Sequence, residues 1–225
     1  ARDITALTVT PAPLRGEAGA IPAANVDIRV VKCWYQSGAR TAFSGLKLFT
    51  PELLLKDDSL VRVDHEKKEN HLKLTYPSGE TKYVSITSPE PKPEFRSSGA
   101  VLPNDEFPVR DSGELLPVDI TAGTNRQFWV TIRVPEDAAP GIYDGRIELK
   151  AGDMAVGGLS LHLRVLPFAL VPSPLTYSIY YLGRLDSTGK GSISSKAKSP
   201  AQFRAEMRNL AQHGVTSPGL HQGFD

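Results

Sequence analysis

The sequence contains one cysteine, Cys33, in 225 residues. A single cysteine excludes an intramolecular disulfide and also the structural zinc sites built from Cys₄ or Cys₂His₂ ligand sets. Cys33 lies in the apolar run Val30–Tyr35, which predicts that it is a small buried core residue. With 40% hydrophobic residues, the chain has enough apolar content for a core of its own.

Long apolar runs and blocks of basic residues are also missing. No segment approaches the roughly 20 apolar residues that a membrane-spanning helix needs, so we expect a soluble protein without a membrane span. Lys and Arg number 26 against 25 Asp and Glu, and they form no cluster of the kind that follows phosphates. We therefore expect no nucleic-acid partner.

The amino terminus has no charged and apolar leader of the signal-peptide type. The chain starts at Ala1, and a segment rich in Pro, Ala and Gly follows over residues 11–24. This pattern fits an exported protein, extracellular or periplasmic, whose signal peptide has been removed. A sequence that starts at an arbitrary residue of a longer chain would look the same.

Several catalytic signatures are absent. The sequence has no Gly-x-Ser-x-Gly elbow, no Walker loop and no Gly-x-Gly-x-x-Gly after a strand, and we expect no cofactor. Its adjacent acidic pairs include Asp57-Asp58 and Glu136-Asp137. Neighbouring side chains on a strand point to opposite faces, and in a loop they are solvated, so we interpret both pairs as solvated surface residues. No catalytic residue is predicted.

The histidines give a weak metal signal. His65 and His71 flank a charged loop and could meet across a hairpin, with Asp64 as a third ligand. Metal sites require ligands that converge in space, and sequence spacing alone does not provide this. A solvated hairpin that carries two histidines is the simpler interpretation, and we predict no metal site.

The sequence does contain the alternating apolar and polar residues that are typical of β-strands. This pattern is clearest from Gln127 to Phe168. Phe128, Val130 and Ile132 alternate with polar or outward residues, as in a half-buried strand. Pro140-Gly141 predicts a turn before a second strand over residues 142–150. A third strand is expected over residues 159–165, with His162 facing solvent or pairing across the sheet.

Shorter strands are predicted along the rest of the chain. They lie at residues 4–9 (an edge strand), 26–35, 60–64, 71–75, 82–86 and 115–120. The leucine-rich segment 46–55 is ambiguous between a strand and a helical turn, residues 66–70 read as a solvated hairpin loop, and residues 88–108 as a long irregular loop. About eight to ten short strands favour a mainly β fold, an antiparallel β-sandwich of the Ig-like or jelly-roll-like kind.

The pattern changes after residue 172. Residues 177–181 predict a strand, Ser199-Pro200 predicts the start of a helix that ends near Gly214, and Val215 starts another strand. A β-α-β segment cannot bury both faces of its sheet by itself. We therefore predict a β-sandwich domain over residues 1–172 and a truncated second domain over residues 173–225.

Three segments carry a family resemblance, namely Val30–Gln36, Pro51–Asp58 and Phe128–Phe168. Together they resemble glycoside hydrolase family 123-like proteins of bacteria. The resemblance implies an N-terminal β-sandwich followed by a (β/α)8 barrel, whose first strand, helix and second strand would match residues 175–225. Residues 209–216 look like a barrel junction between helix and strand.

The resemblance also implies a reaction. Such a family cleaves a glycosidic bond of an N-acetylated or related sugar, through a neighbouring acidic pair that acts with the substrate's acetamido group. Those acids would lie beyond Asp225, so no catalytic residue is carried over. Whether this chain is itself an enzyme stays open.

Aromatic side chains are the candidate glycan contacts, because flat rings stack on the apolar faces of pyranoses. The candidates are Trp34, Tyr35, Trp129, Tyr180 and Tyr181. Trp129 and Tyr35 are out of phase with the aliphatic faces of their strands, which leaves them either exposed or covered by a neighbouring domain. Tyr180 and Tyr181 would lie near the carboxyl end of a first barrel strand, where barrel active sites form.

Three functions remain open on sequence grounds. The leading hypothesis is the N-terminal, non-catalytic sandwich of an exported glycoside hydrolase-like protein, which supports the barrel and contacts glycan. The alternative is a self-standing carbohydrate-binding or cell-surface module. The third is an assembly subunit that self-associates through a sheet edge or through the apolar face of the tail helix, formed by Phe203, Met207 and Leu210.

Overall fold

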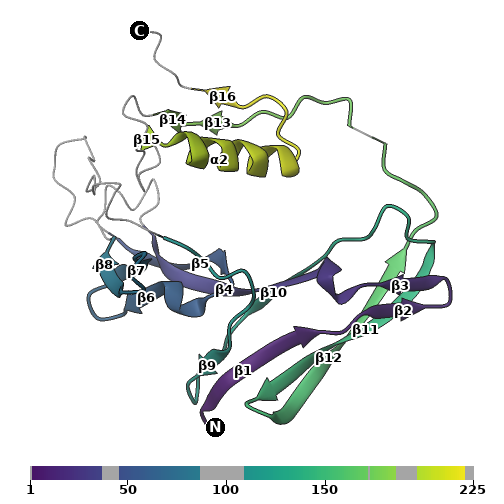
Figure 1. The fold of residues 1–225 in the computed structure, drawn as a ribbon, viewed down its shortest axis with the longest axis horizontal. Helices are drawn as coiled ribbons and strands as arrows, with labels where there is room; N and C mark the ends of the chain where they lie inside the picture. The colour runs from purple at the N-terminus through teal and green to yellow at the C-terminus, as the bar shows by residue number, and fades with distance from the viewer. Residues whose placement is uncertain (1, 37–45, 87–108, 172, 186–196, 221–225) are drawn as a thin grey trace. The chain divides into compact units, whose positions relative to one another are not determined.

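The computed structural model describes residues 2–36, 46–86, 109–171, 173–185 and 197–220, and over these the chain is mainly β (Figure 1). It divides into two compact units. The first unit comprises residues 1–73, 83–85 and 110–169, and the second unit comprises residues 74–82, 86–109 and 170–225. The long loop expected at 88–108 and most of the polar segment 186–198 lie outside the described residues.

The largest sheet of the first unit has six strands in the order β3-β2-β11-β1-β9, with β12 paired to β11. Every pairing in it is antiparallel. The strands are β1 (Ile4–Pro11), β2 (Leu14–Gly16), β3 (Gly19–Ile21), β9 (Val118–Ile120), β11 (Gly141–Ala151) and β12 (Met154–Val165). The expected antiparallel β character of this region is confirmed.

The prediction that β1 forms a sheet edge is wrong. β1 pairs with β11 on one side and with β9 on the other. Its register shifts between Ile4 and Leu7, where Ala6 has a positive φ of 52° and its amide donates to the Asp119 carboxylate at 2.8 Å. Both partner strands lie more than a hundred residues away in the chain, so the strand's own sequence could not reveal them.

The β11–β12 hairpin is longer than predicted. β12 begins at Met154 and runs through Gly157 and Gly158, because this stretch pairs with β11, with a register shift at Val156, which has no partner in the ladder. Gly152, with φ of +57°, makes the left-handed turn between the two strands. Leu159, expected on the core face, is mostly exposed.

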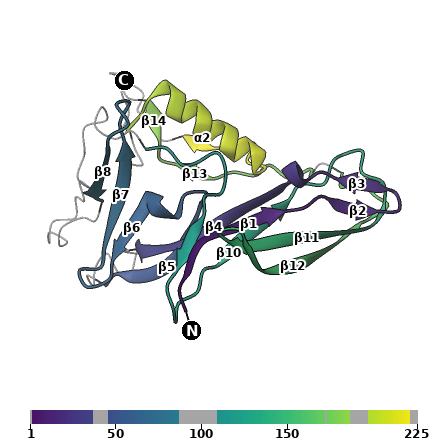
Figure 2. The ribbon, with the colours of Figure 1, turned by 60° about the horizontal axis from the view of Figure 1, so that its bottom comes forward.

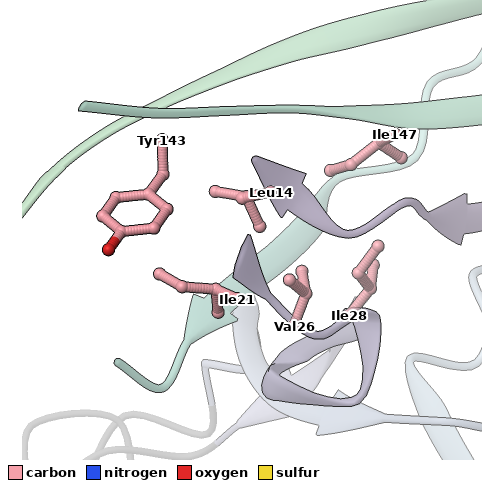
Figure 3. Packing of buried hydrophobic residues seen from close by; sticks show 6 residues of the cluster. All are labelled: Leu14, Ile21, Val26, Ile28, Tyr143 and Ile147. Carbon is pink, nitrogen blue, oxygen red and sulfur yellow. The ribbon is translucent and has the colours of Figure 1, made fainter. Parts of the chain in front are cut away.

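A second sheet supplies the other side of the core. It contains β10 (Phe128–Ile132), β4 (Val26–Gln36) and β5 (Leu48–Leu55), so the ambiguous leucine-rich segment is a strand. Figure 3 shows six buried side chains that converge from β2, β3, β4 and β11: Leu14, Ile21, Val26, Ile28, Tyr143 and Ile147. The inward residues of β10 pack against them, which confirms the predicted alternation.

The chain between β5 and residue 86 forms a three-stranded sheet (Figure 2). Its strands are β6 (Val61–Asp64), β7 (Glu69–Thr75) and β8 (Thr81–Ser85). Asn70, expected in the solvated loop, is instead buried in β7. Its amide accepts from the Tyr35 N–H at 2.9 Å and donates to the Tyr35 carbonyl at 2.7 Å, so it ties β7 to β4.

The second unit contains strand–helix–strand structure. β13 (Tyr180–Tyr181) pairs in parallel with β16 (Gly219–Leu220), and β14 (Arg184–Leu185) pairs in parallel with β15 (Ala197–Lys198). Helix α2 (Pro200–Gln212) lies between β15 and β16 in sequence. The second strand starts later than the predicted Val215. In the described part of the chain, no helix is long and apolar enough to cross a bilayer.

Helix α2 confirms the most local of the predictions. The Ser199 side chain accepts from the Gln202 N–H and the Gln202 side chain accepts from the Ser199 N–H, a reciprocal capping box, with Pro200 in the first turn. Gly214, with φ of +83°, ends the helix. No apolar residue of α2 is fully buried.

Candidate functional site

The first unit contains a groove of about 420 Å³, called here the β4–β6 groove. Strands β4, β5, β6 and β8 contribute to its lining, together with the short 3-10 helix η2 (Asp58–Leu60) and residues 125–127. Its side chains are a mixture of rings, cations and one carboxylate. Concave sites of mixed apolar and polar lining are where small ligands most often bind.

One wall of the groove is aromatic. Phe49 on β5 and His65 lie with their ring centroids 5.1 Å apart, edge to face. Tyr35 on β4 packs against both, 5.3 Å from Phe49 and 6.0 Å from His65, and its hydroxyl lies 3.4 Å from His65 Nδ1. Tyr35 therefore supports the two rings that line the groove.

The lining also contains charged groups. Lys32 Nζ donates to the Asp58 carbonyl at 2.7 Å and to Asp58 Oδ1 at 3.0 Å, and Arg126 lies 3.7 Å from Asp58 Oδ2. Arg62 on β6 stacks on Tyr83 of β8, with its guanidinium carbon 3.9 Å from the ring centroid. The Tyr83 hydroxyl donates to the Ser59 carbonyl at 2.6 Å, which fixes the ring.

The interpretation of Asp57-Asp58 as solvated acids is wrong. Asp57 is 7% exposed and caps η2, because its carboxylate accepts from the Ser59 N–H at 2.8 Å and from the Ser59 hydroxyl at 2.6 Å and pairs with Lys73. Burial raises the pKa of Asp57, but the hydrogen bonds from Lys73 and Ser59 outweigh it and hold that pKa below 3.8. Asp57 is therefore an ionised structural residue.

Glu136 and Asp137 are both exposed, as the sequence predicted. His65 and His71 contact different residues. His65 joins the aromatic wall, whereas His71 faces Glu69 at 3.7 Å. Asp64 accepts the backbone N–H groups of its own turn, and the described residues contain no group of three or more His, Cys, Asp or Glu placed to hold a metal ion. His162 pairs across the hairpin with Asp144 at 2.6 Å, one of its two predicted placements.

Cys33 lines the β4–β6 groove and is partly exposed, which corrects the prediction that it is a core residue. The core positions of β4 are the alternate residues Val26, Ile28 and Val30. Cys33 is out of phase with them. An apolar sequence neighbourhood indicated a buried position, whereas the strand phase decides which face a residue occupies.

The predicted aromatic contacts of the first unit do not form one platform. Trp34 packs against the buried cluster around Val30 and donates to Glu52 at 2.7 Å. Trp129 is 53% exposed and lies opposite Arg29, six residues from Tyr35 and so about 20 Å along β4. Tyr35 is the one of the three that adjoins the groove. Glycan contact at these residues stays a prediction.

In the second unit, Tyr180 and Tyr181 have different environments. Tyr180 is 85% exposed, whereas the Tyr181 ring packs edge to face on Phe203, with centroids 5.8 Å apart. The Tyr181 hydroxyl donates to Glu206 at 2.5 Å, and Lys198 pairs with the same carboxylate at 2.7 Å. Burial, followed by the hydrogen bond and charge of Glu206, raises the pKa of Tyr181 far above its usual value, so the phenol stays protonated.

The sequence reasoning missed Arg62, Tyr83 and Phe49 as groove residues. Arg62 and Tyr83 are outward members of alternating strands, a position that the sequence assigns to a solvated face, and Phe49 lies in the leucine-rich segment that the sequence left ambiguous. What distinguishes the three residues is that β5, β6 and β8 bring them to one groove. The available signal was the presence of arginine and tyrosine on the outward faces of two strands predicted within one short region.

Comparison with known families addresses the resemblance directly. A family model described as the glycoside hydrolase 123 N-terminal domain matches residues 63–151. The resemblance to glycoside hydrolase family 123 is confirmed. The matched range begins at Val63, near the end of β6, and continues through β7, β8 and the strands β9 to β11.

A solved structure is also similar to this chain. It is a family 123 glycoside hydrolase from Clostridium perfringens, studied for the hydrolysis of glycolipid glycans, at 14% sequence identity and a TM-score of 0.49. The match covers 97% of this chain and 29% of that protein, so this chain spans less than a third of its length. None of the curated proteins matches this chain.

Proposed function

We propose that this chain is the N-terminal, non-catalytic portion of an exported glycoside hydrolase-like protein of the family 123 kind. In this proposal residues 1–172 form a β-sandwich that supports a (β/α)8 barrel and contacts glycan through the β4–β6 groove. The observation that carries it is the match of residues 63–151 to an N-terminal domain of that family. The carbohydrate is the proposed partner.

The arrangement of the two sheets supports a sandwich. Side chains from β2, β3 and β11 of one sheet meet those from β4 and β10 of the other across one core. This is how face-to-face sheets bury their inner faces. The division of the chain between residues 169 and 170 supports a domain boundary near residue 172.

The second unit supports a barrel start at residues 173–225. A parallel pair of strands joined through a helix is the repeating unit of (β/α)8 barrels. Its apolar side chains are mostly uncovered in the structure, including Ile179, Tyr180, Leu182 and Leu185, each about half exposed or more. Parallel strands of this kind are buried on both faces in complete domains.

The state of the acids supports a non-catalytic role. A glycosidase acid must carry a raised pKa, opposite a second carboxyl group. Asp57 has a lowered pKa, Asp58 is paired with Lys32 and Arg126, and Glu206 is paired with Lys198. Asp57 thus lacks the raised pKa of a proton donor, and Asp58 and Glu206 are each engaged by cations.

The proposal is tested by hydrolysis and by size. We expect purified 1–225 to leave chromogenic N-acetylhexosaminides intact, and we expect the protein recovered from its native source to hydrolyse at least one of them. The intact mass of that native protein should exceed 24.4 kDa by about 25 kDa or more, the size of a barrel. Turnover by 1–225, or a native mass of 24.4 kDa, would overturn the proposal. Export is tested separately, by fractionating the native cells.

A second candidate is a self-standing carbohydrate-binding module, and the groove with its rings and cations favours it. It shares the binding prediction but requires a native mass that matches this chain. Self-association is a third arrangement, favoured by β12, a twelve-residue strand that pairs only with β11 among the described strands. Size-exclusion chromatography with light scattering separates it from the other two, since it predicts an oligomer.

A further inference from the structure

Arg62 is positioned in the β4–β6 groove with its guanidinium carbon over the Tyr83 ring, 3.9 Å from the ring centroid. The Tyr83 hydroxyl is itself anchored to the Ser59 carbonyl. Among the residues that the structure describes, no carboxylate or carbonyl oxygen lies within ion-pair or hydrogen-bond distance of the Arg62 guanidinium. The contact with Tyr83 thus places the guanidinium, and its N–H donors have no partner among those residues.

The other cations of the groove differ from Arg62. Lys32 and Arg126 both face Asp58, so a single carboxylate serves two positive charges. With Arg62, the described lining residues comprise three cations and one anion, an excess of two positive charges. A concave surface with an excess of one sign concentrates ligands of the opposite sign. The groove is therefore prepared for an anionic group.

The aromatic wall adds a requirement on shape. Phe49 and His65 offer ring surface beside the cations, and Tyr35 holds them in place. A ligand that satisfies both features has a flat apolar face and a negatively charged substituent. An acidic sugar has both, because a pyranose ring has an apolar face and carries its carboxylate or sulfate at the rim.

We propose that the β4–β6 groove binds an acidic saccharide, with its carboxylate or sulfate ester paired to Arg62 and its ring on the aromatic wall. Planar guanidinium groups bind two oxygens of such anions at once, which lysine cannot do. Carboxylate and sulfate share this chemistry. That the ligand is a saccharide rests on the proposed function, whereas the anion preference rests on the groove alone.

The experiment measures binding of matched sugars to 1–225 by isothermal titration calorimetry. Methyl β-glucuronide is compared with methyl β-glucoside for the carboxylate arm, and N-acetylgalactosamine 6-sulfate with N-acetylgalactosamine for the sulfate arm. We expect at least one acidic sugar to bind about tenfold or more tightly than its neutral counterpart, the effect of one charge-assisted hydrogen bond. The arm that shows the preference identifies the anion.

Variants assign the effect to Arg62. Arg62→Gln should abolish the preference, and Arg62→Lys should keep only part of it because the charge remains without the two-pronged geometry. The matched control is Arg164→Gln, which removes an exposed strand arginine of β12 outside the groove. It should bind as the unmodified chain does. Thermal melting checks that each variant is folded.

Three results would overturn the proposal. They are equal binding of the acidic and neutral sugars in both arms, a preference that survives in Arg62→Gln, and inorganic sulfate that binds as tightly as the sulfated sugar. The last result would show that the groove recognises the anion alone and not a saccharide. Hydrolysis by 1–225 would overturn the proposed function without altering the Arg62-dependent preference, so the two failures are distinguishable.

Discussion

Asp57 illustrates how one side chain organises the groove region. Its carboxylate caps η2 through Ser59 and pairs with Lys73 on β7, so it joins the segment after β5 to the neighbouring sheet. Asp58 then presents its carboxylate to Lys32 and Arg126 in the groove. The placement of the groove cations thus depends on a residue that does not line the groove.

We predict that Asp57→Asn lowers the free energy of unfolding at pH 7 by about 2 kcal/mol, because the uncharged amide binds Lys73 and Ser59 less strongly. The folded-state pKa of Asp57 lies below its ordinary value of 3.8. Its stabilising contribution is therefore complete above pH 3.8 and is lost as the pH falls through the lower, folded-state pKa. Urea denaturation at several pH values measures both effects.

Asp137→Asn is the control for that substitution, since Asp137 is exposed and has no ion pair among the described residues. It should change stability by less than about 0.5 kcal/mol. The assigned role of the carboxylate would be contradicted if the difference in unfolding free energy between the unmodified chain and Asp57→Asn stayed constant down to pH 2.

At the scale of elements, two glycines let β2 and β11 approach each other closely. A Cβ atom on Gly16 would lie 2.3 Å from the Ile142 carbonyl oxygen. Gly145 is also constrained, because a Cβ there would lie 2.8 Å from the Leu14 side chain. These two glycines let the short strand β2 lie against β11 and bring Leu14 into the core.

We predict that Gly16→Ala destabilises the protein by about 2 kcal/mol, because a backbone atom must move to admit the methyl group. Gly157→Ala on β12 is the matched control. The nearest atom to its new Cβ is a Leu149 methyl at 3.8 Å, an ordinary contact, and we expect a change of less than about 1 kcal/mol. Equal losses in the two variants would show that the close approach has no energetic weight.

Elements with local signals were predictable from sequence. Helix α2 has its start at Ser199, its first-turn proline and its terminating Gly214 within one stretch, and the structure has each of them. The alternation of β10 likewise identified its core face. β1 was misread as an edge because strand position depends on partners far away in the chain.

The sequence predicted the type of residue at the candidate site but not which residues form it. Aromatic residues near β4 were expected to matter, and Tyr35 does support the groove wall. Arg62, Tyr83 and Phe49 were not predicted, since the meeting of β5, β6 and β8 is a tertiary event. Asp57 was misread because a sequence pattern cannot distinguish a solvated acid from a cap with a paired cation.

At the scale of the whole molecule, the chain should behave as two units. Residues 166–171 lie outside regular structure, and the side chains of Phe168 and Leu170 are 63% and 88% exposed. This is where the first unit ends and the second continues. Exposed segments between compact units are the preferred sites of limited proteolysis.

We predict that brief chymotrypsin treatment cleaves after Phe168 or Leu170 ahead of the other apolar sites that the structure describes. Phe128 is the matched site, because it is also a phenylalanine but is paired in β10 and packed on the core. Intact mass spectrometry of the products identifies the cut. Cleavage at Phe128 before Phe168 would contradict the two-unit description.

The pairing of β1 has a consequence for how the protein is made. Leu7 lies opposite Val118 on one side and Ala151 on the other, and translation adds about 5–20 residues per second. Roughly 7 to 30 s therefore separate the synthesis of this strand from that of its last partner. During that interval the nascent chain can close the β6–β7 turn but cannot complete its main sheet. We expect β1, which is synthesised before its partners, to be among the last strands of this sheet to become ordered.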